Sequence, residues 1–113
     1  MKVTQSAVLS PTLAAQTKRL GAALARLRIA RGMKQDLVAL RAGLSRNTAY
    51  RLEKGDPGVA MGQLLRYLDA IVPGKTLIEL LSETDPALAA LGAQEKRRRA
   101  RELTKGELDE IDF

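Results

Sequence analysis

Arg46 and Asn47, which are adjacent in the chain, carry side chains suited to recognising DNA bases. In the major groove an arginine can bond bidentately to guanine and an asparagine to adenine. The apolar periodicity predicts a helix at residues 45–54, with Tyr50 and Arg51 also on its outward face. The inward face of this helix comprises Thr48, Ala49 and Leu52. An ordinary solvated helix start is the alternative interpretation of Arg46 and Asn47. Tyr50 is as compatible with a packed amphipathic position as with a contact to the DNA backbone.

A tight turn joins this helix to a second short one. Residues 34–42 also have helical spacing, and Gly43 and Leu44 leave room only for a sharp corner before Ser45. A glycine can adopt the left-handed conformation that ends a helix, and a serine hydroxyl can cap the next one. Two helices joined in this way form a helix-turn-helix, whose second helix can enter a DNA major groove.

Three stretches around this motif resemble the Xre/Cro family of phage-repressor-like regulators. They are Leu-Arg-Ile-Ala-Arg-Gly-Met-Lys-Gln at 27–35, Ala-Leu-Arg-Ala-Gly-Leu-Ser at 39–45 and Arg-Leu-Glu-Lys-Gly at 51–55. The resemblance covers a little under half of the chain and implies a repressor-like, five-helix DNA-binding domain. Lys34 departs from the family pattern, which usually has a threonine there. The helix that follows Lys34 therefore loses a side-chain cap and gains a charge that can bind phosphate.

The resemblance also implies roles for individual residues. It puts the base-contact positions at Ser45, Arg46, Asn47 and Arg51. It makes Arg28 and Glu53 an ion pair between the first and third helices of the domain. The free backbone amides at Lys34 and Gln35 are suited to hold one phosphate, and Lys54 is suited to hold another. The predicted DNA-binding set is Lys34, Gln35, Ser45, Arg46, Asn47, Tyr50, Arg51 and Lys54.

The rest of the chain is predicted to be helical as well. Further helices are predicted from Ser10-Pro11 to Gly32, over 61–72, from Thr76 to Leu81 and from Asp85-Pro86 onward. Thr76 and Glu79 can form a capping box at the start of the third of these. Thr104 and Glu107 can form another, at the start of a last helical turn. Residues 1–9 show no clean period and are expected to form an extended arm or a short edge strand. We therefore expect an all-α protein. Its parts are an N-terminal arm (1–10), a five-helix helix-turn-helix domain (11–82) and a helical, charged C-terminal extension (83–113).

The charges are divided unevenly along the chain. Residues 1–54 hold 11 basic and 2 acidic side chains, residues 55–113 hold 8 and 11, and the formal net charge is +6. A basic half on a small domain is typical of a protein with a polyanionic partner, although it is also compatible with a solubilising surface. Five of the six residues 96–101 are basic. This run is compatible with a solvated helix face, with a phosphate contact or with docking on an acidic partner.

Composition excludes several classes of function. The chain has no cysteine and no histidine, which removes disulfides, Ser-His and Cys-His nucleophile pairs and nearly all transition-metal sites. Three aromatic residues are too few for a sheet that stacks bases. No apolar run approaches the ~20 residues of a membrane span, and residues 1–11 lack the apolar core of a signal peptide. We therefore expect a cytoplasmic protein that is not an enzyme, needs no cofactor and does not bind a membrane.

Two functions fit these observations, and double-stranded DNA is a partner in both. The first is a sequence-specific repressor that binds a palindromic operator as a homodimer, because a single helix-turn-helix buries too little surface for tight, selective binding. The second rests on residues 10–12 and 55–59, which look like the corresponding parts of HipB-like antitoxins. That resemblance implies an antitoxin that neutralises a HipA-like serine/threonine kinase and represses its own operon.

The dimer is expected to form through the helices at 61–72 and 76–81. Their apolar residues exceed what a small domain needs for its core: Leu64, Leu68, Ile71, Val72, Leu77, Ile78, Leu80 and Leu81. A helix as short as 76–81 is not stable alone in water and must be buried. The competing interpretation is a monomer whose C-terminal tail folds back over this surface.

Overall fold

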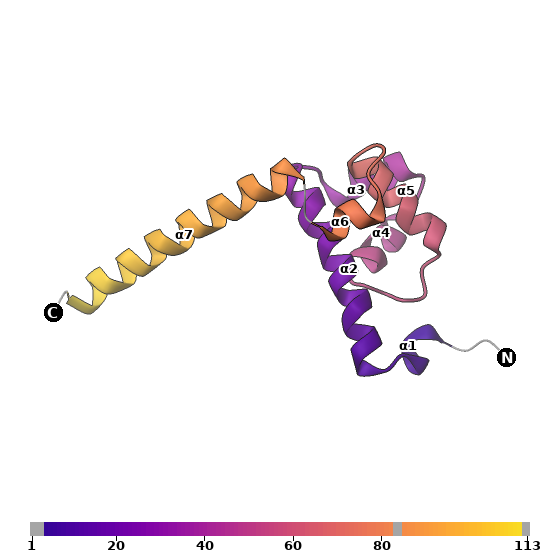
Figure 1. Cartoon of the computed structure of the whole chain (residues 1–113), viewed down its shortest axis with the longest axis horizontal. Helices are drawn as coiled ribbons and strands as arrows, with labels where there is room; N and C mark the ends of the chain where they lie inside the picture. Colours follow the sequence, from indigo (N-terminus) through magenta and orange to yellow (C-terminus); the bar gives the residue numbers. More distant parts are fainter. Residues whose placement is uncertain (1–3, 83–84, 112–113) are drawn as a thin grey trace.

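The computed structural model describes residues 4–82 and 85–111, and side chains as far as residue 102. All regular structure in these residues is helical, which confirms the predicted all-α class. The helices are α1 (Gln5–Val8), α2 (Pro11–Ala30), α3 (Gln35–Ala42), α4 (Arg46–Glu53), α5 (Met61–Ile71), α6 (Leu77–Leu81) and α7 (Pro86–Ile111). Helices α2 to α6 pack together, whereas α7 extends away from them (Figure 1). Among the described helices, none has both the length and the hydropathy needed to cross a membrane.

The N-terminal segment differs from the prediction. Residues Gln5–Val8 form the short helix α1, so the expected extended arm or edge strand is wrong for this part of the chain. A single turn such as this needs few backbone bonds, among them Ala7 N–H to Thr4 O at 3.0 Å, and leaves no apolar period for sequence analysis to detect. Residues 1–3 of the predicted arm lie outside the described part of the chain.

Local capping signals were reliable guides to where helices begin. Ser10 Oγ accepts a hydrogen bond from Leu13 N–H at 3.2 Å, directly before Pro11 at the first position of α2. Thr76 and Glu79 form the expected reciprocal box at the start of α6. Lys34, in contrast, makes no side-chain cap at the start of α3, as expected for a lysine in place of threonine. These features depend on neighbours within three residues, so the sequence alone can reveal them.

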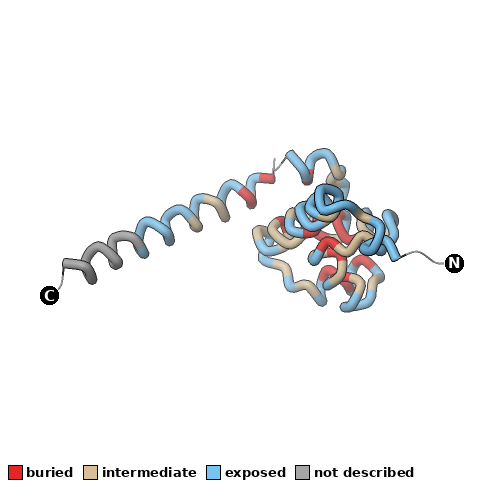
Figure 2. Tube along the Cα trace, turned by 90° about the horizontal axis from the view of Figure 1, so that it is seen from below, coloured by how far each residue is buried: buried red, intermediate tan, exposed pale blue. Residues whose placement is uncertain are grey.

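The core lies where α2, α3, α4 and α5 meet (Figure 2). The core side chains that are at most 2% exposed are Leu24, Leu27, Val38, Ala39, Ala49, Leu52, Tyr67, Leu68 and, from α6, Leu80. Burial of each large aliphatic side chain contributes roughly 1.5–3 kcal/mol relative to exposure. The inward positions expected for α4 are confirmed, because Ala49 and Leu52 belong to this core and Thr48 is half-buried.

The apolar stripe of α5 is mostly core rather than free surface. Leu68 and Ile71 are buried, and Leu64 and Val72 pack against the core, so the expectation that all four supply an interface is wrong. It is wrong for two residues of α6 as well, because Leu80 is buried and Leu77 packs against the core. The outward apolar side chains of these two helices are instead Met61, Leu65, Ile78 and Leu81. We call these four residues the exposed α5–α6 set.

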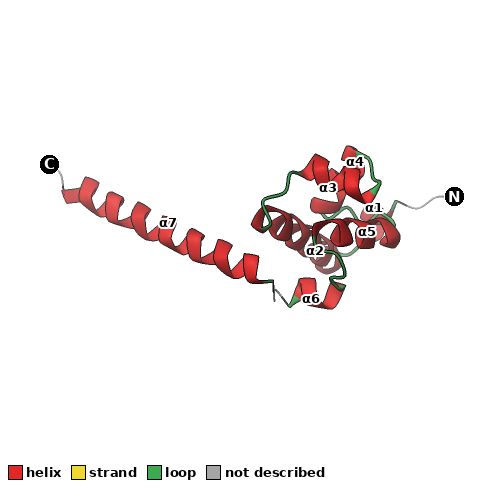
Figure 3. Cartoon of the chain, turned by 90° about the horizontal axis from the view of Figure 1, so that it is seen from above, coloured by secondary structure: helices red, strands yellow, loops and turns green. Residues whose placement is uncertain are grey.

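Helix α7 is continuous from Pro86 to Ile111, so residues 104–107 lie within the helix rather than beginning a separate last turn. The helix contacts α2 and contributes Leu88 to the core, and it then runs out from the domain (Figure 3). The described part of the tail therefore leaves the exposed α5–α6 set uncovered, which is contrary to the folded-back interpretation.

Candidate nucleic-acid interface

Helices α3 and α4 form the predicted tight corner. Gly43 ends α3 with φ 70°, and Leu44 N–H donates to Ala39 O at 2.9 Å. Ser45 Oγ then accepts from Thr48 N–H at 3.1 Å and caps α4. Because Ser45 is the cap, Arg46 is the first residue of α4 and lies in its exposed first turn.

Two glycines allow α4 to reach the backbone of α2. A Cβ added to Gly21 would lie 2.5 Å from Gly55 N and 2.6 Å from Leu52 O. A Cβ on Gly55, whose φ is +75°, would clash with the backbone of Lys18. Both contacts are with backbone, so no side-chain rotation could relieve them. This close approach fixes the C-terminal end of α4 against α2, and sequence analysis missed it because Gly21 lies inside a helical pattern with no local signal.

A buried polar network holds the same end of α4. Arg28 Nε and Nη2 donate to Glu53 at 2.7 and 2.9 Å, which confirms the ion pair that the family resemblance implied. Arg28 Nη1 also donates to Met33 O at 2.9 Å, and the Tyr67 hydroxyl donates to Glu53 Oε2. The network therefore joins α2, α4, α5 and the turn before α3.

The network shifts the pKa values of its members. Hydrogen bonding to Glu53 raises the pKa of Arg28, and burial, followed by the bond to Glu53, raises the pKa of Tyr67. At neutral pH the arginine is therefore charged and the phenol is protonated, as the hydrogen bonds require. The Tyr67 contribution was missed at the sequence level because it depends on the packing of α5 against α4.

The outward face of α4 presents the expected base-contact groups. Ser45, Arg46 and Asn47 are exposed. Within the described residues, the side chains of Arg46 and Asn47 make no hydrogen bond or ion pair. Their donors and acceptors are therefore available to a ligand. Among the exposed residues of α4, these two carry the side chains best suited to base recognition.

Tyr50 and Lys54 lie together at the surface. Tyr50 is 53% exposed, and Lys54 Nζ lies 5.4 Å from the centre of its ring. This geometry is a cation–π contact between two exposed side chains. The interpretation of Tyr50 as a packed residue is therefore wrong. Its ring lies at the surface beside Lys54, the predicted phosphate ligand.

Arg51 is held differently from the expectation. Its Nε donates to Asp56 Oδ2 at 2.7 Å, and Asp56 Oδ1 accepts from Gly58 N–H at 2.7 Å. The bond from Arg51, followed by the bond from Gly58, lowers the pKa of Asp56. Arg51 thus fixes the loop between α4 and α5 instead of lying free on the outward face. The Arg51–Asp56 pair was not predicted, because the composition of residues 55–59 does not imply a partner five residues away.

At the start of α3, the predicted phosphate site is shared with an acidic side chain, that of Asp36. Lys34 is exposed and Gln35 is half-buried. Asp36 occupies the first turn of α3 and lines a shallow hollow shared with Ser45 and Arg46. A carboxylate at a helix N-terminus already satisfies part of the helix dipole, which weakens anion binding there.

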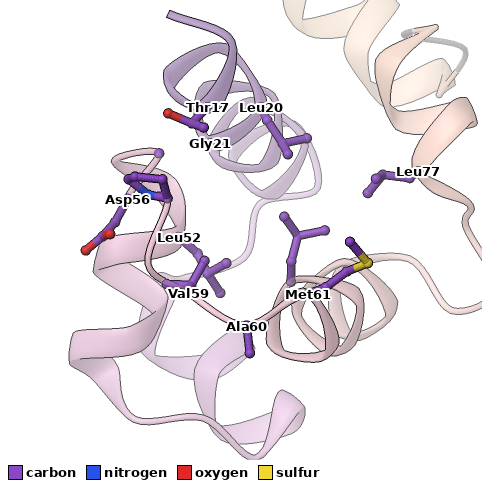
Figure 4. Close-up of a pocket in the computed structure, with 12 residues that line it drawn as sticks. Thr17, Leu20, Gly21, Leu52, Asp56, Val59, Ala60, Met61 and Leu77 are labelled. Carbon is purple, nitrogen blue, oxygen red and sulfur yellow. The ribbon is translucent and has the colours of Figure 1, made fainter. Parts of the chain in front are cut away.

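A separate apolar pocket of about 220 Å³ lies between α2, α5 and the loop that joins α4 to α5 (Figure 4). Its lining includes Leu20, Leu52, Val59, Met61 and Leu77. The Thr17 hydroxyl already donates to Ala14 O at 2.9 Å, and the one lining carboxylate, that of Asp56, is already bonded to Arg51 and Gly58. Pockets for small-molecule ligands are typically larger, about 300–1,000 Å³.

Comparison with known proteins finds a helix-turn-helix domain in the central part of the chain. Residues 19–72 match the family model described as a helix-turn-helix domain. The match covers just under half of the chain and includes α3, α4, α5 and most of α2, that is, the motif and the helices that hold it. It supports DNA binding by this domain. No curated protein and no solved structure matches the chain.

Proposed function

We propose that this protein is a sequence-specific transcriptional repressor that inserts α4 into the DNA major groove. The observation that carries the proposal is the pair of unbonded side chains on α4, Arg46 and Asn47, within a region that matches a helix-turn-helix domain. The Arg28–Glu53–Tyr67 network and the Gly21–Gly55 crossing support it, because base recognition needs a helix with a fixed orientation.

Phosphate contacts in this proposal come from the ends of the same motif. Lys34 and Gln35 lie at the start of α3, and Lys54 follows the end of α4. Contacts of this kind position the protein on the duplex without distinguishing one sequence from another. Arg51 serves the proposed interface indirectly, by fixing the loop through Asp56.

The proposed repressor acts as a homodimer. Met61, Leu65, Ile78 and Leu81 expose apolar surface on two neighbouring helices, and α6 has only five residues. A partner with two-fold symmetry would cover this surface and double the DNA contacts. The operator would then be palindromic, with half-sites about one helical turn, ~34 Å, apart.

A second candidate function is favoured by the shape of α7. This helix projects from the DNA-binding domain with exposed sides, a geometry suited to a protein partner (Figure 1). In this alternative the chain is an antitoxin that neutralises a HipA-like kinase and represses its own operon. Truncation after Glu83 would then abolish kinase binding and leave base discrimination intact. A gene for such a kinase beside this one would favour the antitoxin.

Selection from a pool of random duplexes tests the proposed function. The full-length chain should enrich one consensus with two inverted half-sites. Lys54→Ala should enrich the same consensus while binding every duplex more weakly, because it removes a phosphate contact alone. The absence of any enriched sequence would contradict sequence-specific recognition, and a consensus with a single half-site would contradict the dimer.

A further inference from the structure

We propose that the basic run at residues 96–101 of α7 binds DNA phosphates that flank the half-site recognised by α4. This inference rests on the proposed DNA-binding function and adds a second contact surface to it. The run lies outside the region that matches the helix-turn-helix family.

The start of α7 is fixed to the domain, so the run has a defined direction. Asp85, which precedes α7, is buried and accepts from Arg31 Nη2 at 2.6 Å, with Lys75 Nζ 3.5 Å away. Further along, Arg26 Nη2 lies 2.8 Å from Glu95 Oε1. These contacts anchor α7 from its beginning to the residue directly before the basic run.

Within the run, the cations fall into two groups. Arg98 lies 3.7 Å from Glu102 and Arg99 lies 3.9 Å from Glu95. Lys96, Arg97 and Arg101 form no ion pair with any described carboxylate. Three unpaired cations on one short helical segment are a strong local source of positive potential.

Two of these three cations, Arg97 and Arg101, lie on the side of α7 opposite its contacts with the domain. Glu95, which contacts Arg26 of α2, and the core residue Leu88 project within about 20° of each other when each residue turns the helix by about 100°. On the same scale Arg97 and Arg101 lie about 170° and 130° from that direction, on the opposite side of the helix, and Lys96 lies at its flank, about 90° away. All three side chains are exposed.

The reach of α7 places this face beyond the domain. Lys96 is ten residues after Pro86, which corresponds to about 15 Å of helix. In Figure 3, α7 starts near α6 and approaches the level of α3 and α4 as it leaves the domain. A duplex carries one negative charge per ~1.7 Å of its axis, so in this proposal a duplex that is bound to α4 and extends past the domain presents a continuous row of phosphates to α7.

DNA is favoured over an acidic protein as the occupant. The basic run is attached to a domain that matches a helix-turn-helix family and that has exposed cations at Arg46 and Lys54. A single DNA duplex could therefore bind the basic run and the exposed face of α4 together. An acidic protein would need a separate binding event, and no described feature of α7 is specific for one.

Two matched double variants test the inference in the full-length chain. Arg97→Gln/Arg101→Gln removes two unpaired cations, and Arg98→Gln/Arg99→Gln removes two paired cations from the same helix. Glutamine is a good helix former, so circular dichroism should show unchanged helicity in both. The probe is a mixed-sequence duplex of roughly 40 base pairs, titrated between about 50 and 200 mM salt.

We expect the first variant to lower the slope of log K against log salt by about 1.8 per chain, since each lost phosphate contact removes ~0.9. The second should lower it by less than half as much. Equal losses in the two variants would overturn the assignment to the unpaired face, and no loss in either would overturn the phosphate contact. If the first variant lost binding to poly-glutamate but kept its slope on DNA, the occupant would be an acidic protein and the inference would be wrong. A flat salt response of the unaltered chain would instead contradict the proposed function itself.

Discussion

Glu53 accepts hydrogen bonds from the partly buried Arg28 and the buried Tyr67, and only Arg28 balances its charge. Arg28 contributes a bidentate pair and Tyr67 one neutral hydroxyl. Because Glu53 is nearly buried, loss of the guanidinium leaves a carboxylate without a counter-charge. Such a loss typically costs about 3–5 kcal/mol, whereas a neutral hydrogen bond contributes about 0.5–1.5 kcal/mol.

We therefore expect Arg28→Met to destabilise the domain by about 3–5 kcal/mol and Tyr67→Phe by about 0.5–1.5 kcal/mol. Urea unfolding of the two variants measures both free energies. A loss from Tyr67→Phe as large as that from Arg28→Met would contradict the view that charge balance dominates the network.

Asp85 predicts a pH dependence with a definite sign. The bond from Arg31, the largest cause, lowers the pKa of Asp85 in the folded state, and Ala87 N–H and Lys75 lower it further. A carboxylate with a lowered folded-state pKa stabilises the fold above its unfolded pKa of about 3.9. That stability is lost as the pH falls through the lower, folded-state value.

The Asp85→Asn variant isolates this effect, because an amide can still accept the bond from Ala87 N–H. The difference in unfolding free energy between the two proteins should be constant from about pH 5 to 8 and should shrink below about pH 4. A difference that does not change with pH would show that Asp85 contributes by packing rather than by charge.

At the scale of elements, the crossing of α2 and α4 is the contact most sensitive to an added methyl group. Gly21→Ala places a Cβ 2.5 Å from Gly55 N and 2.6 Å from Leu52 O. Overpacking of this kind typically costs about 1–3 kcal/mol, and here it would also displace the C-terminal end of α4. Thermal or urea unfolding measures the loss.

Gly62→Ala is the matched control, since a Cβ there meets no atom within 4 Å. An alanine inside a helix is generally favoured over glycine by about 0.5–1 kcal/mol, so this variant should be neutral or slightly stabilised. Equal destabilisation by both substitutions would mean that the α2–α4 crossing is not tight.

The elements that sequence analysis predicted well are those with local causes. Ser10 and Thr76 cap their helices through neighbours three residues away, and Gly43 ends α3 by its own conformation. The Arg28–Glu53 pair was accessible only through family resemblance, because its partners are 25 residues apart. The contacts of Gly21 and of Tyr67 were missed because both arise only once the helices have packed.

For the molecule as a whole, the central question is what covers the exposed α5–α6 set. Ile78 is 80% exposed and Met61 is 77% exposed, and α7 leads away from α5 and α6, the helices that carry them (Figure 1). Sequence analysis predicted that apolar side chains would exceed the needs of the core but named the wrong ones on α5, because a stripe alone does not show how deeply its helix is buried. Leu68 and Ile71 belong to the core, and Met61 and Leu65 face outward.

The proposed dimer predicts that Ile78→Asp converts a dimer into a monomer at micromolar concentration, since it would bury a charge in the interface. Sedimentation equilibrium measures the mass. Leu40→Asp is the control, because Leu40 is similarly exposed at 77% but lies on α3. A chain that is monomeric before any substitution would remove the dimer, and dissociation by Leu40→Asp alone would place the interface on α3.

The most direct test of the central claim, that α4 recognises bases, is the ratio of affinities for the selected duplex and for its scrambled counterpart. Arg46→Ala should reduce this ratio by an amount equivalent to about 1–3 kcal/mol, because one bidentate base contact is lost while most phosphate contacts remain. Titration of both duplexes at one salt concentration gives the ratio for the unaltered chain and for the variant. If Arg46→Ala weakened both duplexes by the same factor, Arg46 would be a phosphate ligand, and the assignment of α4 as a base-recognition helix would be contradicted.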